Sequence, residues 1–325
     1  MQKKPFALII FGPTAVGKTS FALQLAQNIP AEIVNGDSAQ VYTPLSVGTA
    51  KPDWKNEPVP HHLFDIIDEP RDFSVVEYRQ KLIATVNDIF SRGKVPIIVG
   101  GSGFYLKSLF FLVSTETSSE KNTHGKDFSW EKLYEVDPER AKKIQKNDTY
   151  RINRALSIWY NTGKKPSEFV PIYDPPFNFL LCYLTRDRQQ LYKRINTRTH
   201  QMVQEGWLQE VKDLHQTEWK EFLYRKKFIG YDVLLEHLAG AISLDEAVAL
   251  IQQRTRHYAK RQATFWKTFQ RQLDDATKEY SKNPSSPIRL RRTGSSGQTE
   301  LVNLTLLDRD LYIKQLLKRL RVHIN

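Results

Sequence analysis

Short, uninterrupted apolar runs recur along the chain, and each is typical of a strand buried on both faces. They lie at 6–11, 31–34, 95–99 and 179–184, with a further candidate at 301–306. A helical pattern follows the first run, because Phe21, Leu25 and Ile29 recur after Lys18. Buried strands that alternate with helices predict an α/β fold with a doubly wound parallel sheet.

Two serine residues mark the starts of longer helices. Ser74 with Glu77, and Ser243 with Glu246, fit the capping-box pattern. In that pattern the serine hydroxyl and the acidic side chain each accept a hydrogen bond from the other residue's backbone N–H. The first pair predicts a helix as far as Phe90, and the second opens a long basic helix.

The pattern changes in the middle of the chain. Residues 113 to about 130 are polar and predict a loop. Residues 130–169 have helical spacing and many Arg and Lys side chains. Because this stretch lies between two predicted strands, we expect a helical insertion at 113–175 within a core made of residues 1–112 and 176–325.

The end of the chain returns to regular structure after an irregular segment. Residues 279–299 contain Pro, Ser and Gly without an apolar period, and they predict a loop. The strand candidate at 301–306 follows, and then a basic helix at 309–321.

The composition narrows the class of protein. The chain has 48 Lys and Arg against 36 Asp and Glu, a net charge of +12. This excess suits a polyanion such as nucleic acid, although it also fits a basic protein without such a partner. The single cysteine excludes a disulfide framework and a cysteine-based zinc site, so a reducing cytoplasm is expected. No apolar run approaches the roughly 18 residues of a membrane span.

A phosphate-binding loop stands between the first strand and the first helix. The motif G-x-x-x-x-G-K-[ST] is matched by Gly12, Pro13, Thr14, Ala15, Val16, Gly17, Lys18 and Thr19. Its backbone N–H groups and the helix N-terminus surround an anion, Lys18 adds positive charge, and the Thr19 hydroxyl can ligate Mg²⁺. Both a nucleoside triphosphate and a pyrophosphate ester fit such a loop.

Further motifs follow the loop in a definite order. They are Asp37-Ser38-Ala39-Gln40-Val41-Tyr42, Gly48-Thr49-Ala50-Lys51-Pro52, His61-His62-Leu63-Phe64-Asp65-Ile66, Gly100-Gly101-Ser102-Gly103-Phe104-Tyr105-Leu106, Asp137-Pro138-Glu139, Asn147-Asp148, Arg151, Arg154-Ala155-Leu156, Gly230-Tyr231 and Tyr258-Ala259-Lys260-Arg261-Gln262. Over roughly residues 6–270 this set resembles the tRNA dimethylallyltransferases. Taken one at a time, only the phosphate loop is a specific motif. The other motifs support the resemblance through their order and spacing.

The resemblance implies a fold and a reaction. It implies a P-loop NTPase-like core with a helical insertion that binds tRNA, in a cytoplasmic monomer. The reaction transfers a dimethylallyl group from dimethylallyl pyrophosphate to the N6 amine of adenosine 37, beside the tRNA anticodon. The phosphate loop would hold the donor with Mg²⁺ bound by Thr19, no ATP would be consumed, and Asp37, Lys18 and Thr19 would be catalytic.

The resemblance also implies a set of tRNA-contacting residues. They are Asp37, Ser38, Ala39, Gln40, Ser102, Tyr150, Arg151, Ile152, Asn153, Arg154, Lys227, Phe228, Ile229, Gly230, Tyr231 and Asp232. Three of them depart from the family pattern, since Ser102 replaces a usual threonine, Tyr150 a glutamine and Lys227 an arginine. The family's active-site arginine after Leu112 is missing from 114–127, where Lys121 or Lys126 could substitute.

Several of these residues have alternative roles. On the long helix, Arg256 and Lys260 share one face and are the favoured pyrophosphate ligands, while Arg254, His257 and Arg261 share another. A solvated basic helix is the alternative for both faces.

Asp37 is the candidate general base that accepts a proton from the amine, although it could instead ligate Mg²⁺ or cap a helix. His61 and His62 are interpreted as structural or substrate-lining residues rather than a metal pair. Tyr42, Phe104 and Tyr105 are candidates for holding a base.

Three other functions share parts of this pattern. A kinase of a small molecule uses the same loop, and an adenylate isopentenyltransferase acts on free AMP, ADP or ATP. Neither requires the basic helical stretch at 130–169 or the charge of +12. A non-catalytic RNA-binding protein would need neither the intact loop nor Asp37.

Overall fold

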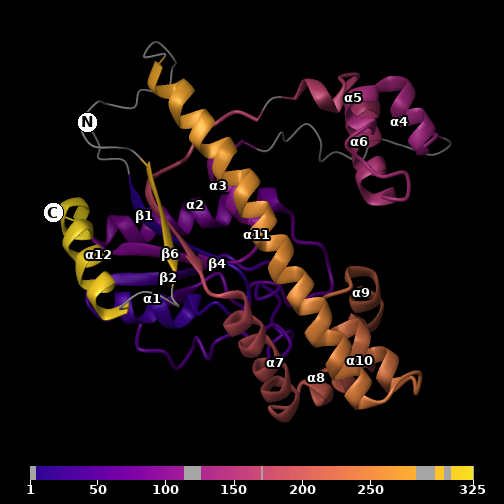
Figure 1. The fold of residues 1–325 in the computed structure, drawn as a ribbon, viewed down its shortest axis with the longest axis horizontal. Coiled ribbons are helices and arrows are strands. Elements are labelled where there is room, and N and C mark those ends of the chain that lie inside the picture. The colour runs from indigo at the N-terminus through magenta and orange to yellow at the C-terminus, as the bar shows by residue number, and fades with distance from the viewer. Residues whose placement is uncertain (1–4, 113–125, 170, 283–296, 304–308, 325) are drawn as a thin grey trace. The chain divides into compact units, whose positions relative to one another are not determined.

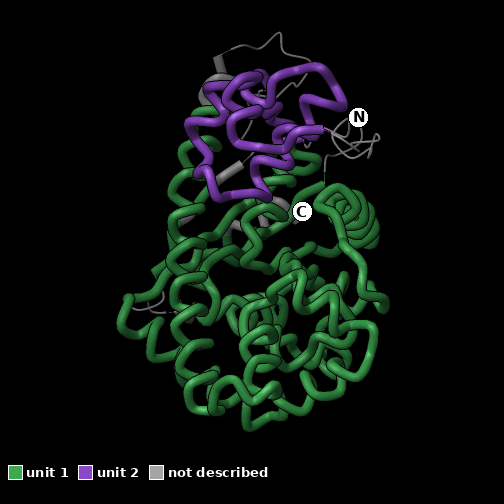
Figure 2. Tube along the Cα trace, turned by 90° about the vertical axis from the view of Figure 1, so that its right-hand side faces the viewer, with its two compact units in different colours: residues 1–110, 175–325 green, residues 111–174 purple. Residues whose placement is uncertain are grey.

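The computed structural model describes residues 5–112, 126–169, 171–282, 297–303 and 309–324. The chain divides into two compact units, one formed by Met1–Phe110 with Pro175–Asn325 and the other by Phe111–Asp174 (Figure 2). Each unit has its own hydrophobic core. No described helix combines the length and hydropathy that crossing a bilayer requires.

The larger unit is built on a six-stranded, all-parallel sheet (Figure 1). The strands, in sheet order, are β3 (His61–His62), β2 (Ala31–Asn35), β4 (Val95–Gly100), β1 (Phe6–Phe11), β5 (Asn178–Thr185) and β6 (Gly297–Asn303). The chain runs to one side after β1 and to the other after β4, so the order reverses between these two neighbours. The fold is therefore P-loop NTPase-like α/β, as predicted, and its reversal point is where such sheets bind ligands.

Helices cover both faces of this sheet. They are α1 (Lys18–Ala26), α2 (Val75–Ser91), α3 (Gly103–Phe110), α7 (Arg188–Gln204), α11 (Leu244–Lys282) and α12 (Arg309–Ile324). The shorter helices α8 (Trp207–His215), α9 (Trp219–Lys226) and α10 (Tyr231–Leu238) form a group that packs against α7 and α11. Alternate residues of a strand point to opposite faces, so Leu8 and Ile10 join the core under α1, α7 and α12. Phe11 on the other face packs against Trp266 of α11.

The sequence located most of these elements. Ser74 and Ser243 form the predicted capping boxes, each accepting from the glutamate N–H three residues on. The predicted loop at 279–299 is wrong at both ends, because α11 continues through Lys282 and β6 begins at Gly297. Lys278, Glu279 and Lys282 are good helix formers, which explains the longer helix. The middle of that loop, 283–296, lies outside the described residues, as does 113–125.

The smaller unit is helical and lies in sequence between α3 and β5. Its helices are α4 (Trp130–Val136), α5 (Pro138–Ala141), α6 (Thr149–Thr162) and the 3-10 turn η2 (Pro166–Glu168). The buried Asp137 carboxylate caps α5 through the Arg140 N–H and holds the Ser167 N–H. At the base of the unit the chain pairs with itself, since Leu112 N–H donates to the Ile172 carbonyl at 2.9 Å.

Candidate active site

The phosphate loop connects β1 to α1 in the conformation its motif predicts. Gly17 has a φ of 110°, in the left-handed region that favours glycine. The Lys18 Nζ lies back along the loop and donates to the carbonyls of Gly12 and Pro13 at 3.0 and 2.9 Å. Burial lowers the pKa of Lys18 to about 8, although Asp37 nearby opposes the shift. A bound anion would raise the pKa again, because it stabilises the charged form.

Asp37 lies just beyond the end of β2 and is held by its neighbours. Its backbone N–H donates to Asn35 Oδ1 at 2.8 Å, and its Oδ1 accepts from the Ala39 N–H at 3.0 Å. The other carboxylate oxygen, Oδ2, has no hydrogen-bond partner among the described residues. No described α-helix begins at Asp37, so the helix-cap alternative is wrong. One oxygen is left to accept a proton or a metal ion.

The loop after β4 joins this segment to the phosphate loop. The Ser38 N–H donates to Ser102 Oγ at 2.9 Å, and the Ser102 hydroxyl donates to Ser38 Oγ at 3.0 Å. Gln262 of α11 donates to the Gly101 carbonyl and accepts from the Thr14 N–H, both at 2.8 Å. Three segments far apart in sequence are thereby held together at the reversal point of the sheet.

Arginines from α7 and from the connection between β5 and α7 surround the same loop. Arg194 Nε donates to the Ala15 carbonyl at 2.8 Å, and Arg186 donates to the Val16 carbonyl at 3.3 Å. Arg198 donates to the Ala50 carbonyl at 3.4 Å and lines both cavities described below. Burial lowers the pKa of Arg198, but an arginine stays charged at neutral pH. The sequence interpretation missed these residues, although Arg194 and Arg198 have the one-turn spacing of a shared helix face.

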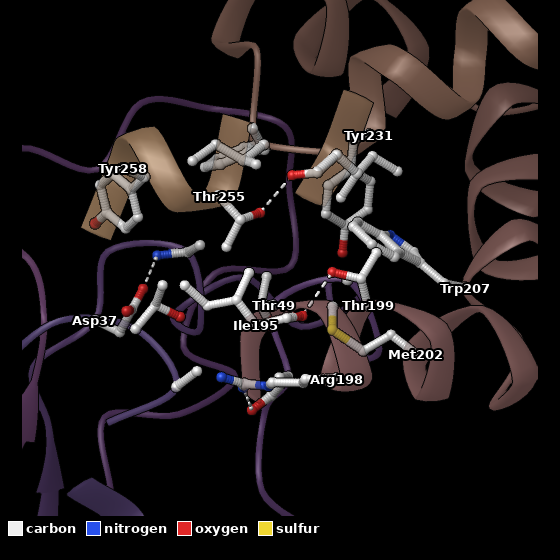
Figure 3. A pocket seen from close by; sticks show the side chains of 18 of the residues that line it. Asp37, Thr49, Ile195, Arg198, Thr199, Met202, Trp207, Tyr231, Thr255 and Tyr258 are labelled. Atoms are coloured by element: carbon white, nitrogen blue, oxygen red, sulfur yellow. Dashed lines mark hydrogen bonds between the residues drawn. The ribbon is translucent and has the colours of Figure 1, made fainter. Parts of the chain in front are cut away.

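Two cavities meet at this point. The phosphate cavity, of about 850 Å³, is lined by Gly17, Lys18 and Thr19. The aromatic cavity, of about 350 Å³, is lined by Trp207 and Tyr231 with most of the segment before α10. Residues that line both are Thr14, Ala15, Asp37, Thr49, Ala50, Arg198, Met202 and Tyr258. Figure 3 shows Asp37 and Tyr258 at one end of the aromatic cavity and Trp207 with Tyr231 at the other.

The expected tRNA-contacting residues fall into three groups. Asp37–Gln40 and Ser102 lie at the reversal point of the sheet, where Gln40 Nε2 donates to the Thr49 carbonyl at 3.0 Å. Four residues of the 227–232 segment line the aromatic cavity: Lys227, Phe228, Ile229 and Tyr231. Asp232 instead pairs with Arg254 at 2.6 Å. The 150–154 segment belongs to the smaller unit.

The favoured cations of α11 do not reach either cavity. Arg256 NH1 donates to Asn196 Oδ1 at 2.8 Å, and neither Arg256 nor Lys260 is among the lining residues. Arg261 does line the aromatic cavity, although Arg254 from the same predicted face does not. The face that α11 presents to the cavities carries Thr255, Tyr258 and Gln262.

The histidine pair has separate contacts. His61 Nδ1 donates to the Val59 carbonyl at 2.6 Å, and burial lowers the pKa of the ring, which favours its neutral form. His62 Nε2 contacts the buried Glu32 at 2.7 Å. Within the described residues no group of three or more His, Cys, Asp or Glu could hold a metal ion. His61 lines the phosphate cavity, in agreement with a structural or substrate-lining role.

A phosphate loop at the reversal point of a parallel sheet, with a carboxylate and several arginines beside it, defines a P-loop phosphate-binding protein. Comparison with known proteins gives the family. Residues 40–269 match the family model of IPP transferases, and the chain belongs to this family.

Relatives and solved structures agree with this assignment. A "tRNA dimethylallyltransferase" of Thermoanaerobacter sp. (strain X514) is 39% identical over 279 residues, covering 81% of this chain and 89% of the relative. A "tRNA dimethylallyltransferase 2" of Geotalea uraniireducens (strain Rf4) is 40% identical, covering 80% of this chain and 88% of the relative.

Two solved structures have similar folds. The tRNA isopentenylpyrophosphate transferase of Bacillus halodurans is 30% identical with a TM-score of 0.66, covering 99% of this chain and 97% of that one. A eukaryotic dimethylallyltransferase acting on tRNA is 30% identical in sequence with a TM-score of 0.68, and the match covers 80% of this chain and 69% of that one.

Proposed function

We propose that the protein transfers a dimethylallyl group from dimethylallyl pyrophosphate to the N6 amine of adenosine 37 in tRNA, releasing pyrophosphate. The observation that carries this proposal is the position of Asp37. It lines both the phosphate cavity and the aromatic cavity. A carboxylate at the junction of an anion site and an aromatic site suits a reaction between a pyrophosphate ester and a nucleobase.

The donor pyrophosphate would bind at the phosphate loop. The loop N–H groups, the Lys18 ammonium and the Arg198 guanidinium face the phosphate cavity from different elements. Breaking the allylic C–O bond leaves positive charge on the carbon and negative charge on the pyrophosphate. Fixed positive groups around the leaving pyrophosphate stabilise that transition state.

The site also fits Mg²⁺. Thr19 lines the phosphate cavity, and among the described residues neither its hydroxyl nor Asp37 Oδ2 has a hydrogen-bond partner. Mg²⁺ is usually held by one or two protein oxygens together with substrate phosphates and water, so a closed set of protein ligands is not needed. Thr19 is the residue we assign to it. The ion would neutralise charge on the pyrophosphate.

The acceptor adenosine would enter the aromatic cavity with N6 toward Asp37. As the new C–N bond forms and the C–O bond breaks, the amine loses a proton, and Asp37 Oδ2 is positioned to accept it. The Ala39 N–H holds the other oxygen and so fixes the orientation of the carboxylate. Asp37 therefore acts as general base in this proposal.

The excess of basic side chains would bind the phosphates of the tRNA backbone. Arg151 and Arg154 lie on α6 of the smaller unit, and Lys226 and Lys227 line the aromatic cavity in the larger one. We assign tRNA binding to both units, and we infer a monomer in the cytoplasm, where tRNA is modified.

A labelling experiment tests the function. The protein is incubated with Mg²⁺ and labelled dimethylallyl pyrophosphate, with bulk tRNA in one reaction and free AMP in another. Label should enter tRNA at an adenosine and should not enter AMP. Transfer to AMP alone would indicate an adenylate isopentenyltransferase, and label in neither acceptor would contradict the proposed function.

A further inference from the structure

Glu210 of helix α8 connects two walls of the aromatic cavity, one containing Gly48 and the other Tyr231, through hydrogen bonds to its carboxylate. Glu210 Oε2 accepts from the backbone N–H groups of Ser46 and Val47 at 2.9 and 2.7 Å. Its Oε1 accepts from the Gly48 N–H at 3.1 Å and from the Tyr231 hydroxyl at 2.7 Å. One side chain therefore holds three successive amides of one segment and the first residue of α10.

The same helix fills the space between these walls. Trp207, one turn before Glu210, is 1% exposed. A Cβ placed on Gly48 would lie 2.1 Å from its Nε1, and one on Gly230 would lie 2.1 Å from its Cη2. The indole is thus in close contact with two glycines. Its Nε1 has no hydrogen-bond partner within the described residues, so shape alone holds this ring.

The hydrogen bonds between α8 and the two walls therefore come from Glu210, and these bonds require a carboxylate at this position. Four donors converge on two oxygens, each of which can accept two hydrogen bonds. Burial and the neighbouring Glu210 raise the pKa of Tyr231, which keeps its hydroxyl protonated and donating. A glutamine would present one acceptor oxygen and would turn an NH₂ group toward N–H donors.

The segment that Glu210 binds, Ser46–Gly48, continues directly into residues that line the aromatic cavity. Gly48, Thr49 and Ala50 all line the aromatic cavity, and the Ala50 carbonyl accepts from Arg198 at 3.4 Å. We propose that Glu210 is a positioning residue that sets the separation of the Gly48–Ala50 wall and Tyr231, and hence the fit of the acceptor base. The identity of that base rests on the proposed function. Glu210 itself lines neither cavity.

The test compares Glu210→Gln with Asp213→Asn in the full-length protein. Asp213 is exposed on the same helix, and among the described contacts its side chain accepts only from Gln209. Its variant therefore removes one charge without changing a contact of either wall. Glu210→Gln should lower kcat/KM for tRNA by about 10- to 100-fold, the usual effect of losing a charge-assisted hydrogen bond. Its equilibrium affinity for dimethylallyl pyrophosphate should stay near that of the wild type. Asp213→Asn should match the wild type in both.

Two outcomes would overturn the assignment. One is a Glu210→Gln enzyme with the kinetics of Asp213→Asn. The other is a uniform loss, in which the donor-binding stoichiometry falls with kcat while both KM values stay constant, because that reports only misfolded protein.

A double-mutant cycle adds a second measure. Tyr231→Phe removes only the hydroxyl bond, so its effect on tRNA KM should be largely absent when Glu210 is already Gln. Strict additivity would contradict a shared contact. If the wild type prenylates free AMP and not tRNA, the proposed function fails, and the same comparison with AMP still tests Glu210.

Discussion

Gln262 accepts a hydrogen bond from the backbone N–H of Thr14, a residue 248 positions earlier, at 2.8 Å. Its amide nitrogen donates to the Gly101 carbonyl at the same distance. The side chain is 5% exposed and lies between the loops after β1 and β4. An amide suits this place because it can donate and accept at once, whereas a carboxylate cannot donate.

Gln262→Glu is therefore predicted to disturb the phosphate loop. It leaves the Gly101 carbonyl without its donor and adds negative charge beside the pyrophosphate, so donor affinity should fall about tenfold or more. Isothermal titration with dimethylallyl pyrophosphate measures it. Gln253→Glu, at an exposed position of the same helix, serves as control. Equal affinity in the two variants would contradict the role of Gln262.

Asp37→Asn is predicted to slow the chemical step while preserving the fold. Loss of a general base should lower the single-turnover rate by roughly 10²- to 10⁴-fold. Affinity for tRNA should stay level or rise slightly, because a negative charge is removed from near a polyanion. Rates measured at low and high Mg²⁺ separate this role from metal ligation, since recovery at high Mg²⁺ would identify a metal ligand. Near-normal single turnover would exclude both.

Donor affinity is predicted to fall as pH rises through about 8, the pKa of Lys18 in the free protein. Below this pH the ammonium attracts the pyrophosphate, and above it the attraction is lost. Stability should change in the opposite direction. Between about 8 and the ordinary value of 10.5, the unfolded chain holds a proton that the folded chain has released, so stability of the free protein rises with pH.

Donor titrations from pH 6.5 to 9.5 check this dependence. Lys18→Met should bind weakly and without the step near pH 8. A wild-type affinity that is flat across this range would show that Lys18 does not bind the donor as a cation.

Binding of tRNA is predicted to be electrostatic. Each phosphate contact adds about 0.7 to 0.9 to the slope of log affinity against log salt. Arg151→Gln on α6 should reduce that slope by about one contact and weaken binding to all tRNA sequences alike. Lys314→Gln on α12, exposed and outside the assigned segments, is the matched control. An unchanged slope in Arg151→Gln would remove that residue from the interface.

Phe104→Ala is predicted to weaken tRNA use without a cost in stability. Of the three aromatic candidates, Tyr42 packs among Trp219, Phe222 and Phe228, and Tyr105 stacks on Tyr78. Phe104 is 76% exposed and can stack on a base. Such stacking contributes about 1 to 3 kcal/mol. Melting curves and kcat/KM for tRNA measure both effects, and a lowered melting temperature would indicate a core role instead.

The sequence predicted those parts of the fold that depend on neighbouring residues. Apolar runs located five of the six strands, and the spacing of Gly12, Gly17 and Lys18 located the phosphate loop. Strand β3 was missed because its two residues, His61 and His62, are too few to carry a periodic signal. Its pairing with β2 depends on the sheet rather than on its own sequence.

The rest of the site depends on which face each helix turns inward. The spacing on α11 grouped Arg256 with Lys260 but could not show that Thr255, Tyr258 and Gln262 occupy the inward face. Arg198 was missed for the same reason, because the packing of α7 against α11, and not a local motif, brings its side chain beside Asp37. Glu210 has no local signal either, since its four donors come from two distant segments.

The self-pairing of the chain at Leu112 and Ile172 has a consequence for how such a protein could be rebuilt. Because the chain leaves the larger unit after Phe110 and returns at Pro175 through paired segments, both ends of the smaller unit are close together. Units with adjacent ends and separate cores tolerate removal and exchange. A short turn in place of Phe111–Asp174 would leave the sheet order untouched, and a foreign RNA-binding module could be grafted there to redirect the enzyme to another transcript.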